Sequence, residues 1–245
     1  MTSDQHYPNA PVTEAVIDVQ VATAATVDAL QDAYAGEEAS YPVIEKLNTT
    51  TGAMVFGPET HAAATASSEP VGYLCRSPDG VQIYQTRTNG YTFSRLARYP
   101  HWGVFSAEAR RLWDKYRAVA KPTAITRVAV RYVNRIDIPL PLKSFGDYLR
   151  TAPQLSPDLP EGLSGYFMQL MIPLTNIKCN GIINQTLIEP AKTDVVSVVL
   201  DIDIFRTEDL PGDEAQLWEL LEQLRQAKNT VFEACITDQA RRLFA

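Results

Sequence analysis

The sequence Ile-Thr-Arg-Val-Ala-Val-Arg-Tyr-Val-Asn-Arg-Ile-Asp-Ile-Pro, residues 125–139, decides the fold because it is the clearest β-strand in the chain. Side chains alternate between the two faces of a strand, so every second residue shares a side. One side is apolar apart from Asn134 and comprises Val128, Val130, Tyr132, Ile136 and Ile138. The other side holds Ala129, Arg131, Val133, Arg135 and Asp137. We therefore expect this strand to cover a core with one face and to present a charged surface with the other.

The composition is that of an ordinary globular protein. Hydrophobic residues make up 45% of the 245 residues and charged residues 21%, so the chain has enough apolar surface for a sizeable core. The formal net charge of -7 opposes general binding to nucleic acids or to anionic membranes, because no net positive field attracts phosphates. No apolar run approaches the ~18 residues of a membrane span. We expect neither nucleic acid nor membrane as a general partner.

The cysteines and the first residues of the sequence predict a cytoplasmic protein. Cys75, Cys179 and Cys235 are odd in number and widely spaced, which favours buried, reduced thiols over disulfides or a metal site. The first residues lack the basic and apolar segments of a secretory signal.

The first half of the chain is expected to combine strands with two helices. Residues 13–21 alternate between apolar and polar, which predicts a strand, and Thr26 is expected to cap a helix. Residues 57–72 are rich in Ala, Thr and Ser with two prolines, which is typical of a long flexible loop. The other expected elements are a short strand at residues 52–56, a hairpin with strands at 71–76 and 81–94 around Ser77–Gly80, and a helix from Ser106 to Pro122.

The second half repeats this order of elements. A short helix is expected at residues 144–150, followed by a proline-containing loop at 151–162. Three strands are expected at residues 163–174, 177–188 and 195–205. Asp213 is expected to cap a long final helix that runs to about Cys235. Its buried stripe comprises Leu217, Leu220, Leu221, Leu224, Val231 and Cys235.

These elements predict an α+β fold. Residues 13–121 and 125–242 form two similar halves with the order strand, helix, strands, helix. Such units pack helices against one face of an antiparallel sheet. We expect one domain, residues 1–245, in which the halves form one curved, mainly antiparallel sheet with long helices on one face, as in saddle or helix-grip folds. Two independent domains are the alternative, but no clear linker separates residues 121 and 125.

Three segments resemble a sporadically distributed bacterial protein family of about this length, for which no function is established. They are residues 7–18, residues 113–136, which end in Arg-Tyr-Val-Asn-Arg-Ile, and residues 232–237. The resemblance implies a bacterial cytoplasmic protein of the accessory, horizontally transferred kind. A role in phage defence or in a toxin–antitoxin-like system fits that distribution. The family brings no catalytic residues to this chain.

Common catalytic signatures are absent from the sequence. It has no glycine-rich phosphate loop, no dinucleotide-binding glycine motif, no His-Glu-x-x-His and no Gly-x-Ser-x-Gly. Charged residues on the polar faces of three strands are therefore the main candidates. They are Glu14 and Asp18 on the first strand, Arg131, Arg135 and Asp137 on the strand at residues 125–139, and Asp201 and Asp203 on the last strand.

These charges have a structural interpretation. If the first strands of the two halves pair antiparallel, Glu14 and Asp18 stand opposite Arg131 and Arg135. Opposite charges across a strand pair contribute about 0.2–1 kcal/mol each, which is a sufficient reason for their presence. The face then neutralises itself and fixes the register of the sheet.

The same charges also have two functional interpretations. In the first, Arg131, Arg135, Glu14 and Asp18 form a ligand site of a non-enzymatic binding or regulatory protein. Its partner is a protein or a small anionic ligand, no cofactor is needed, and homo-oligomers are compatible with it. In the second, Asp201 and Asp203 hold a divalent cation in an enzyme that acts on phosphate esters or nucleotides.

Overall fold

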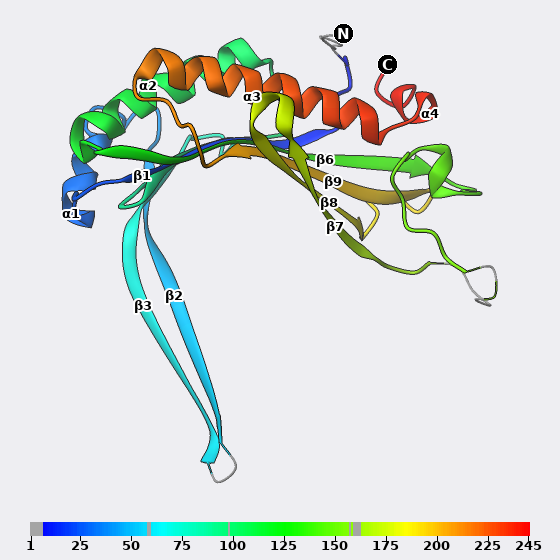
Figure 1. The fold of residues 1–245 in the computed structure, drawn as a ribbon, viewed down its shortest axis with the longest axis horizontal. Helices are drawn as coiled ribbons and strands as arrows, with labels where there is room; N and C mark the ends of the chain where they lie inside the picture. Colours follow the sequence, from blue (N-terminus) through cyan, green and yellow to red (C-terminus); the bar gives the residue numbers. More distant parts are fainter. Residues whose placement is uncertain (1–6, 58–59, 98, 157, 159–162) are drawn as a thin grey trace. The chain divides into compact units, whose positions relative to one another are not determined.

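The computed structural model describes residues 7–245 except residues 58–59, 98, 157 and 159–162. The fold is α+β, with a nine-stranded, open antiparallel sheet and a few helices (Figure 1). The strand order is β2-β3-β4-β5-β1-β6-β9-β8-β7. The class and the antiparallel sheet agree with the sequence-based prediction.

The chain divides into two compact units that are interleaved in sequence. Unit 1 comprises Met1–Asp18, Ser94–His101 and Thr126–Ala245, and unit 2 comprises Val19–Phe93 and Trp102–Ile125. Strands β1 (Val12–Ala22) and β6 (Ala124–Pro139) contribute residues to both units. The prediction of a single domain stays a prediction.

In unit 1, β6 has the two faces that its sequence predicts. Its apolar side is buried, with Val128, Val130, Ile136 and Ile138 all at 0% exposure. Asn134 interrupts this side without breaking the core, because its amide donates to the Leu200 carbonyl at 3.0 Å. In the sheet order β6 is followed by β9 (Val195–Arg206), β8 (Cys179–Ile188) and β7 (Phe167–Leu174), and each adjacent pair is antiparallel.

Helix α3 (Glu214–Cys235) packs on β9 in the same unit (Figure 1). Asp213 caps it as predicted, since its carboxylate accepts from the Gln216 amide. The predicted stripe is buried, and it also contains Lys228 and Phe232. The remaining elements of unit 1 are the 3₁₀ turns η2 (Phe145–Asp147) and η3 (Thr175–Ile177) and the short helix α4 (Asp238–Arg241).

Unit 2 holds helix α2 (Trp102–Ala120), which packs on its strands through Tyr91, Trp113 and Tyr116. Thr26 caps α1 as predicted, since its hydroxyl accepts from the Ala29 amide. The other elements are α1 (Val27–Leu30), η1 (Gln31–Tyr34), β2 (Val43–Gly57), β3 (Thr60–Arg76), β4 (Gln82–Arg87) and β5 (Gly90–Leu96), of which the last three residues belong to unit 1.

Several boundaries predicted for the first half are wrong. The flexible loop expected at residues 57–72 is strand from Thr60 onward, because this segment pairs with a β2 that is far longer than the short strand expected at 52–56. Residues 58–59 lie outside the described residues. The strand expected at 81–94 is two strands, β4 and β5, separated by Thr88 and Asn89.

Two helix predictions also need correction. Helix α2 begins at Trp102 and not at Ser106, whose hydroxyl donates to the Gly103 carbonyl within the first turn. The helix expected at 144–150 is the single turn η2, which Ser144 caps. The two-half repeat and its helix-grip arrangement stay predictions.

Candidate functional site

The uncovered face of the unit 1 sheet brings the candidate charges of β6 and β9 into one surface. The strand register defines four rows of side chains that cross this face from β6 to β7. We call this surface the open face. Its rows are Ala129–Phe205–Asn180–Pro173, Arg131–Asp203–Ile182–Met171, Val133–Asp201–Asn184–Gln169 and Arg135–Val199–Thr186–Phe167.

A continuous chain of hydrogen bonds crosses this face. Arg131 donates through Nε and Nη2 to the two oxygens of Asp201, both at 2.8 Å. Asn184 donates to the same carboxylate at 3.0 Å, and Gln169 donates to the Asn184 carbonyl oxygen at 2.8 Å. Asp201 is 5% exposed, so a buried carboxylate fixes the Arg131 guanidinium in place. The hydrogen bond to Asp201 also raises the pKa of Arg131.

Arg127 forms a second ion-pair cluster on the open face. Its Nη1 lies 3.1 Å from an oxygen of Asp18, and its Nη2 lies 2.6 Å from Asp203 Oδ2. The guanidinium also lies 4.7 Å from the centre of the Phe205 ring. Sequence reasoning missed Arg127, although it continues the alternation of Arg131 and Arg135 by one more step along the strand.

Asp203 is only partly satisfied among the carboxylates of the open face. Burial raises its pKa in spite of the nearby Arg127. Its Oδ1 is buried and has no hydrogen-bond partner in the described part of the chain. The surrounding residues therefore compensate the charge of the Asp203 carboxylate only in part.

The predicted ligand residues lie on this face with partners that differ from those of the register hypothesis. Asp18 pairs with Arg127, and Arg131 pairs with Asp201. Arg135 donates to Asp137 and to Ser197, both at 2.9 Å. Glu14 adds an electrostatic contribution to the raised pKa of Arg131. Ion pairing on the face therefore runs mainly between β6 and β9, and β1 takes part through Asp18.

The predicted cation ligands are occupied by arginines. Asp201 binds Arg131 and Asp203 binds Arg127. Among the residues that the structure describes, no group of three or more His, Cys, Asp or Glu side chains could hold a metal ion. The arrangement thus favours arginine–carboxylate pairing at these positions, and the cation site stays a prediction.

Strand β7 adds two large hydrophobic side chains to the open face, which sequence reasoning did not single out. Phe167 is 69% exposed and Met171 is 70% exposed. They flank Gln169 on a strand whose residues alternate between exposed and half-buried. The sequence signal was the alternating run Phe-Met-Gln-Leu-Met-Ile-Pro-Leu, which has apolar residues on both faces and no charge.

On the helix-covered side, Lys228 occupies a core position of α3. It is 7% exposed, and its ammonium lies 3.8 Å from the centre of the Tyr132 ring. Burial lowers the pKa of Lys228 to about 7. Its position was predictable, because it lies four residues after Leu224 in the buried stripe.

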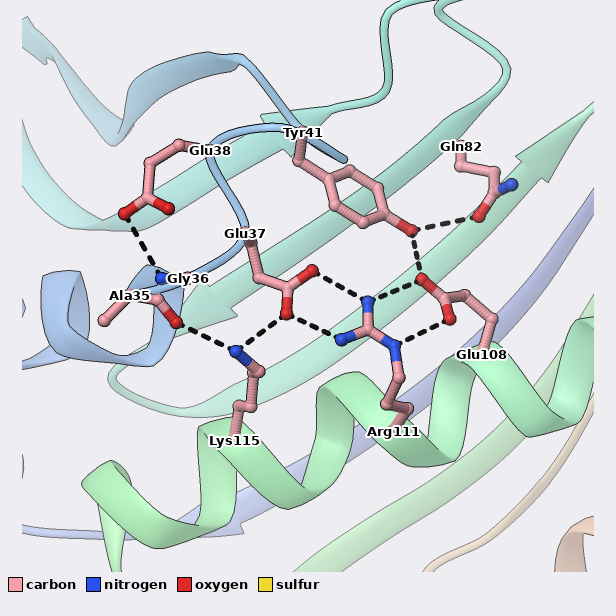
Figure 2. Close-up of polar contacts among 9 residues, drawn as sticks. All are labelled: Ala35, Gly36, Glu37, Glu38, Tyr41, Gln82, Glu108, Arg111 and Lys115. Carbon is pink, nitrogen blue, oxygen red and sulfur yellow. Dashed lines mark hydrogen bonds and ion pairs between the residues drawn. The ribbon is translucent and has the colours of Figure 1, made fainter.

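Unit 2 contains a separate ion-pair cluster around Glu37, shown in Figure 2. Glu37 is 2% exposed and receives two hydrogen bonds from Arg111, at 2.6 and 2.7 Å. Lys115 approaches the same carboxylate at 2.7 Å. Arg111 also binds Glu108, which accepts a hydrogen bond from Tyr41 at 2.8 Å. The hydrogen bonds from Arg111 hold the pKa of both glutamates below the ordinary range.

The chain matches no protein-family model, and none of the curated proteins matches it. The family resemblance of its three segments therefore stays an expectation. Within the described residues, no helix has the length and apolar character that crossing a membrane requires.

Proposed function

We propose that this protein is a non-enzymatic binding protein that engages a partner protein through the open face of unit 1. The observation that carries the proposal is that Arg131 is both exposed and held in place. Its side chain is 49% exposed, although its Nε and Nη2 donate hydrogen bonds to the buried Asp201. An arginine fixed in this way offers its remaining donors to a partner with little loss of side-chain entropy.

Arg131 keeps donors available for recognition. A guanidinium has five N–H groups, and the hydrogen bonds to Asp201 use two of its nitrogens, Nε and Nη2. The Nη1 group has no hydrogen bond within the described residues. It can donate to a carboxylate or a carbonyl of a partner, and arginines in this role are frequent hot spots of protein interfaces.

The surroundings of Arg131 favour a protein over a small anion. The face carries five carboxylates, those of Glu14, Asp18, Asp137, Asp201 and Asp203, against the three guanidinium groups of Arg127, Arg131 and Arg135. Half-buried apolar side chains lie between these charges, among them Val133, Ile182 and Val199. A surface of mixed charge and apolar patches is typical of a protein interface, whereas a free anion would meet an excess of negative charge.

The cellular role and the compartment of the protein are part of the same proposal. The resemblance to a bacterial family supports an accessory role, such as phage defence or a toxin–antitoxin-like system. Three free cysteines, all buried, support a reducing compartment such as the cytoplasm.

A site-specific crosslink tests the proposal. A photo-reactive phenylalanine analogue at Ile182, on the open face, is expected to crosslink one discrete protein in the cells that express the full chain. The same analogue at Leu155, which is 43% exposed outside the open face, is the matched control and should not crosslink it. Crosslinking to the same protein from both positions would contradict a defined interface.

Arg131 is tested with a double variant in the same assay. Arg131→Ala alone leaves the buried Asp201 without its main cation, so its effects on binding and on folding are mixed. Arg131→Ala combined with Asp201→Asn removes both charges and is expected to abolish the Ile182 crosslink, while its free energy of unfolding stays closer to that of the wild type than that of the single variant does. An unchanged crosslink in this double variant would refute the role of Arg131.

A further inference from the structure

The outer edge of β7 pairs with no other strand in the described part of the chain. β7 is the last strand in the sheet order, and β8 is its one strand neighbour in the described part of the chain. Proteins usually protect such edges with charged side chains, bulges or covering segments. The eight residues of β7 carry no charge, and its two most exposed side chains are Phe167 and Met171.

Two observations show which backbone groups face outward. The Tyr166 carbonyl accepts a hydrogen bond from the Thr186 hydroxyl at 2.7 Å, so it points toward β8. Carbonyls alternate along a strand, and therefore those of Phe167, Gln169 and Met171 point to the free edge. The position of Pro173 is consistent with this assignment. A proline has no N–H, so in an edge strand its nitrogen faces the free edge and not the neighbouring strand.

We propose that β7 pairs antiparallel with β7 of a second copy of this chain, about a two-fold axis at Gln169. In this register Gln169 faces its own counterpart, and Phe167 of each copy faces Met171 of the other. Directly opposite residues lie on the same face of a sheet, so four exposed side chains form two aromatic–thioether contacts. The outward amides and carbonyls of Phe167, Gln169 and Met171 supply six main-chain hydrogen bonds across the axis.

The sequence of β7 is complementary to itself in this antiparallel register, which favours a second copy of the chain over an unrelated peptide. The same register places Pro173 opposite Gly165, where a Cβ atom would meet nothing within 4 Å, so the proline ring has room and its missing donor lies at the end of the pairing. The strand has no charge, so two copies meet without like-charge repulsion. An isologous contact of this kind closes as a dimer and does not continue into a fibre.

The dimer would join the two open faces. The polar chain from Arg131 through Asp201 and Asn184 ends at Gln169, whose amide would meet the Gln169 amide of the second copy. The binding surface of the proposed function would then be doubled in one continuous sheet. The pairing itself rests on β7 alone and does not depend on that function.

Sedimentation equilibrium of the full chain, from low to high micromolar concentration, tests the pairing. The wild type is expected to move from one chain mass to two, and Met171→Lys is expected to weaken the dimer at least about tenfold, because a charge at the edge opposes pairing. Leu155→Lys is the matched control at another exposed hydrophobic residue and should not change the dimer. A wild type that stays monomeric throughout, or a Met171→Lys dimer of unchanged strength, overturns the proposal.

A disulfide trap tests the register. Two cysteines at position 169 would have Cα atoms about 5.5 Å apart across the axis, within the range of disulfides. Two cysteines at position 171 would lie at least about 13 Å apart along the paired strands. Gln169→Cys is therefore expected to form a covalent dimer under mild oxidation, and Met171→Cys is not. The three native cysteines are buried and give little background. Dimers from Met171→Cys alone, or from neither variant, would refute this pairing.

Discussion

The Glu37 cluster of unit 2 and the Arg131 cluster of unit 1 are built from the same parts and differ in how far they are closed. Arg111 and Arg131 are similarly exposed, with 43% and 49% of the side chain accessible. Arg111 uses all three of its nitrogens on two glutamates. Arg131 uses two nitrogens on one aspartate.

This difference separates a structural cluster from a candidate site. In the Glu37 cluster a buried carboxylate is surrounded by cations, so each charge is compensated within unit 2. On the open face, Arg131 retains donors and Asp203 has an oxygen without a partner. Exposure alone would rank the two arginines as equals, whereas the count of engaged donors distinguishes them.

The largest effect is expected from Arg111→Ala. It leaves the buried Glu37 with Lys115 as its remaining cation, and we expect a loss of about 2–3 kcal/mol in the free energy of unfolding. Urea denaturation measures it. Arg117→Ala is the control on the same helix, because Arg117 and Asp114 are both about half exposed, and it should cost less than about 1 kcal/mol. Similar losses in both variants would mean that the ion pairs around Glu37 stabilise the fold no more than the exposed Arg117–Asp114 pair does.

Lys228→Met is expected to stabilise the protein by about 1–3 kcal/mol at pH 7, because it replaces a buried ammonium that lacks a carboxylate partner within the described residues. The neighbouring charges that act on Lys228 are Arg225 and Glu233. Denaturation curves of both proteins measure the difference.

The sign of the pH dependence provides a second check on Lys228. The folded-state pKa of about 7 lies below the ordinary 10.5, so the unfolded chain binds the extra proton between these values. Wild-type stability should rise with pH over that interval, and the advantage of Lys228→Met should shrink. An advantage that grows with pH would show that the lysine has a stabilising partner.

A smaller loss is expected from Arg131→Ala, about 1–2 kcal/mol, because Asp201 keeps its hydrogen bond from Asn184. Adding Asp201→Asn should recover part of this loss, since it removes the unpaired charge. Guanidinium denaturation of the wild type, the single variant and the double variant checks the order. If the double variant is the least stable, the aspartate has a further role in the fold.

The smallest expected effect is the difference between the pKa values of the Glu37 and Asp203 carboxyl groups, which carbon-detected NMR titration measures. Glu37 should titrate below 4.5 because of Arg111, and Asp203 above 3.8 because of burial. With its pKa lowered, Glu37 contributes stability that is present above pH 4.5 and is lost as the pH falls through its folded-state value. The pKa of Asp203 is raised, so its contribution to stability depends on pH in the opposite direction. That contribution is lost as the pH rises through the folded-state pKa of Asp203. Equal titration of both groups would remove the distinction between the clusters.

Local patterns in the sequence were sufficient for much of the fold. The alternation around Tyr132 predicted the buried side of β6, and Asp213 predicted the start of α3. Asn89-Gly90 is a strong hairpin signal that would have separated β4 from β5. The low-complexity composition of residues 57–72 was misleading, because the pairing with β2 is what makes this segment a strand.

The partners of the site residues were beyond local reasoning. Arg131 pairs with Asp201, 70 residues away, because β9 lies next to β6 in the sheet order. The expectation had paired β6 with β1 through Arg131 and Arg135, and the alternation shows only that these arginines share a face. Which strand supplies the carboxylate depends on topology, which no spacing within one strand encodes.

The interleaving of the two units has a consequence for the order of folding during synthesis. Unit 2 ends at Ile125, so all of its residues exist when half of the chain has been made. Unit 1 needs both extremes of the described chain, because Tyr7 bonds to Glu233, 226 residues later, and packs against Phe244. Contacts of such sequence separation form slowly and late. The contacts of Tyr7 therefore form only after residues 233–244 have been made, and we expect the emerging chain to pass through a stage in which all residues of unit 2 exist and these contacts of unit 1 do not.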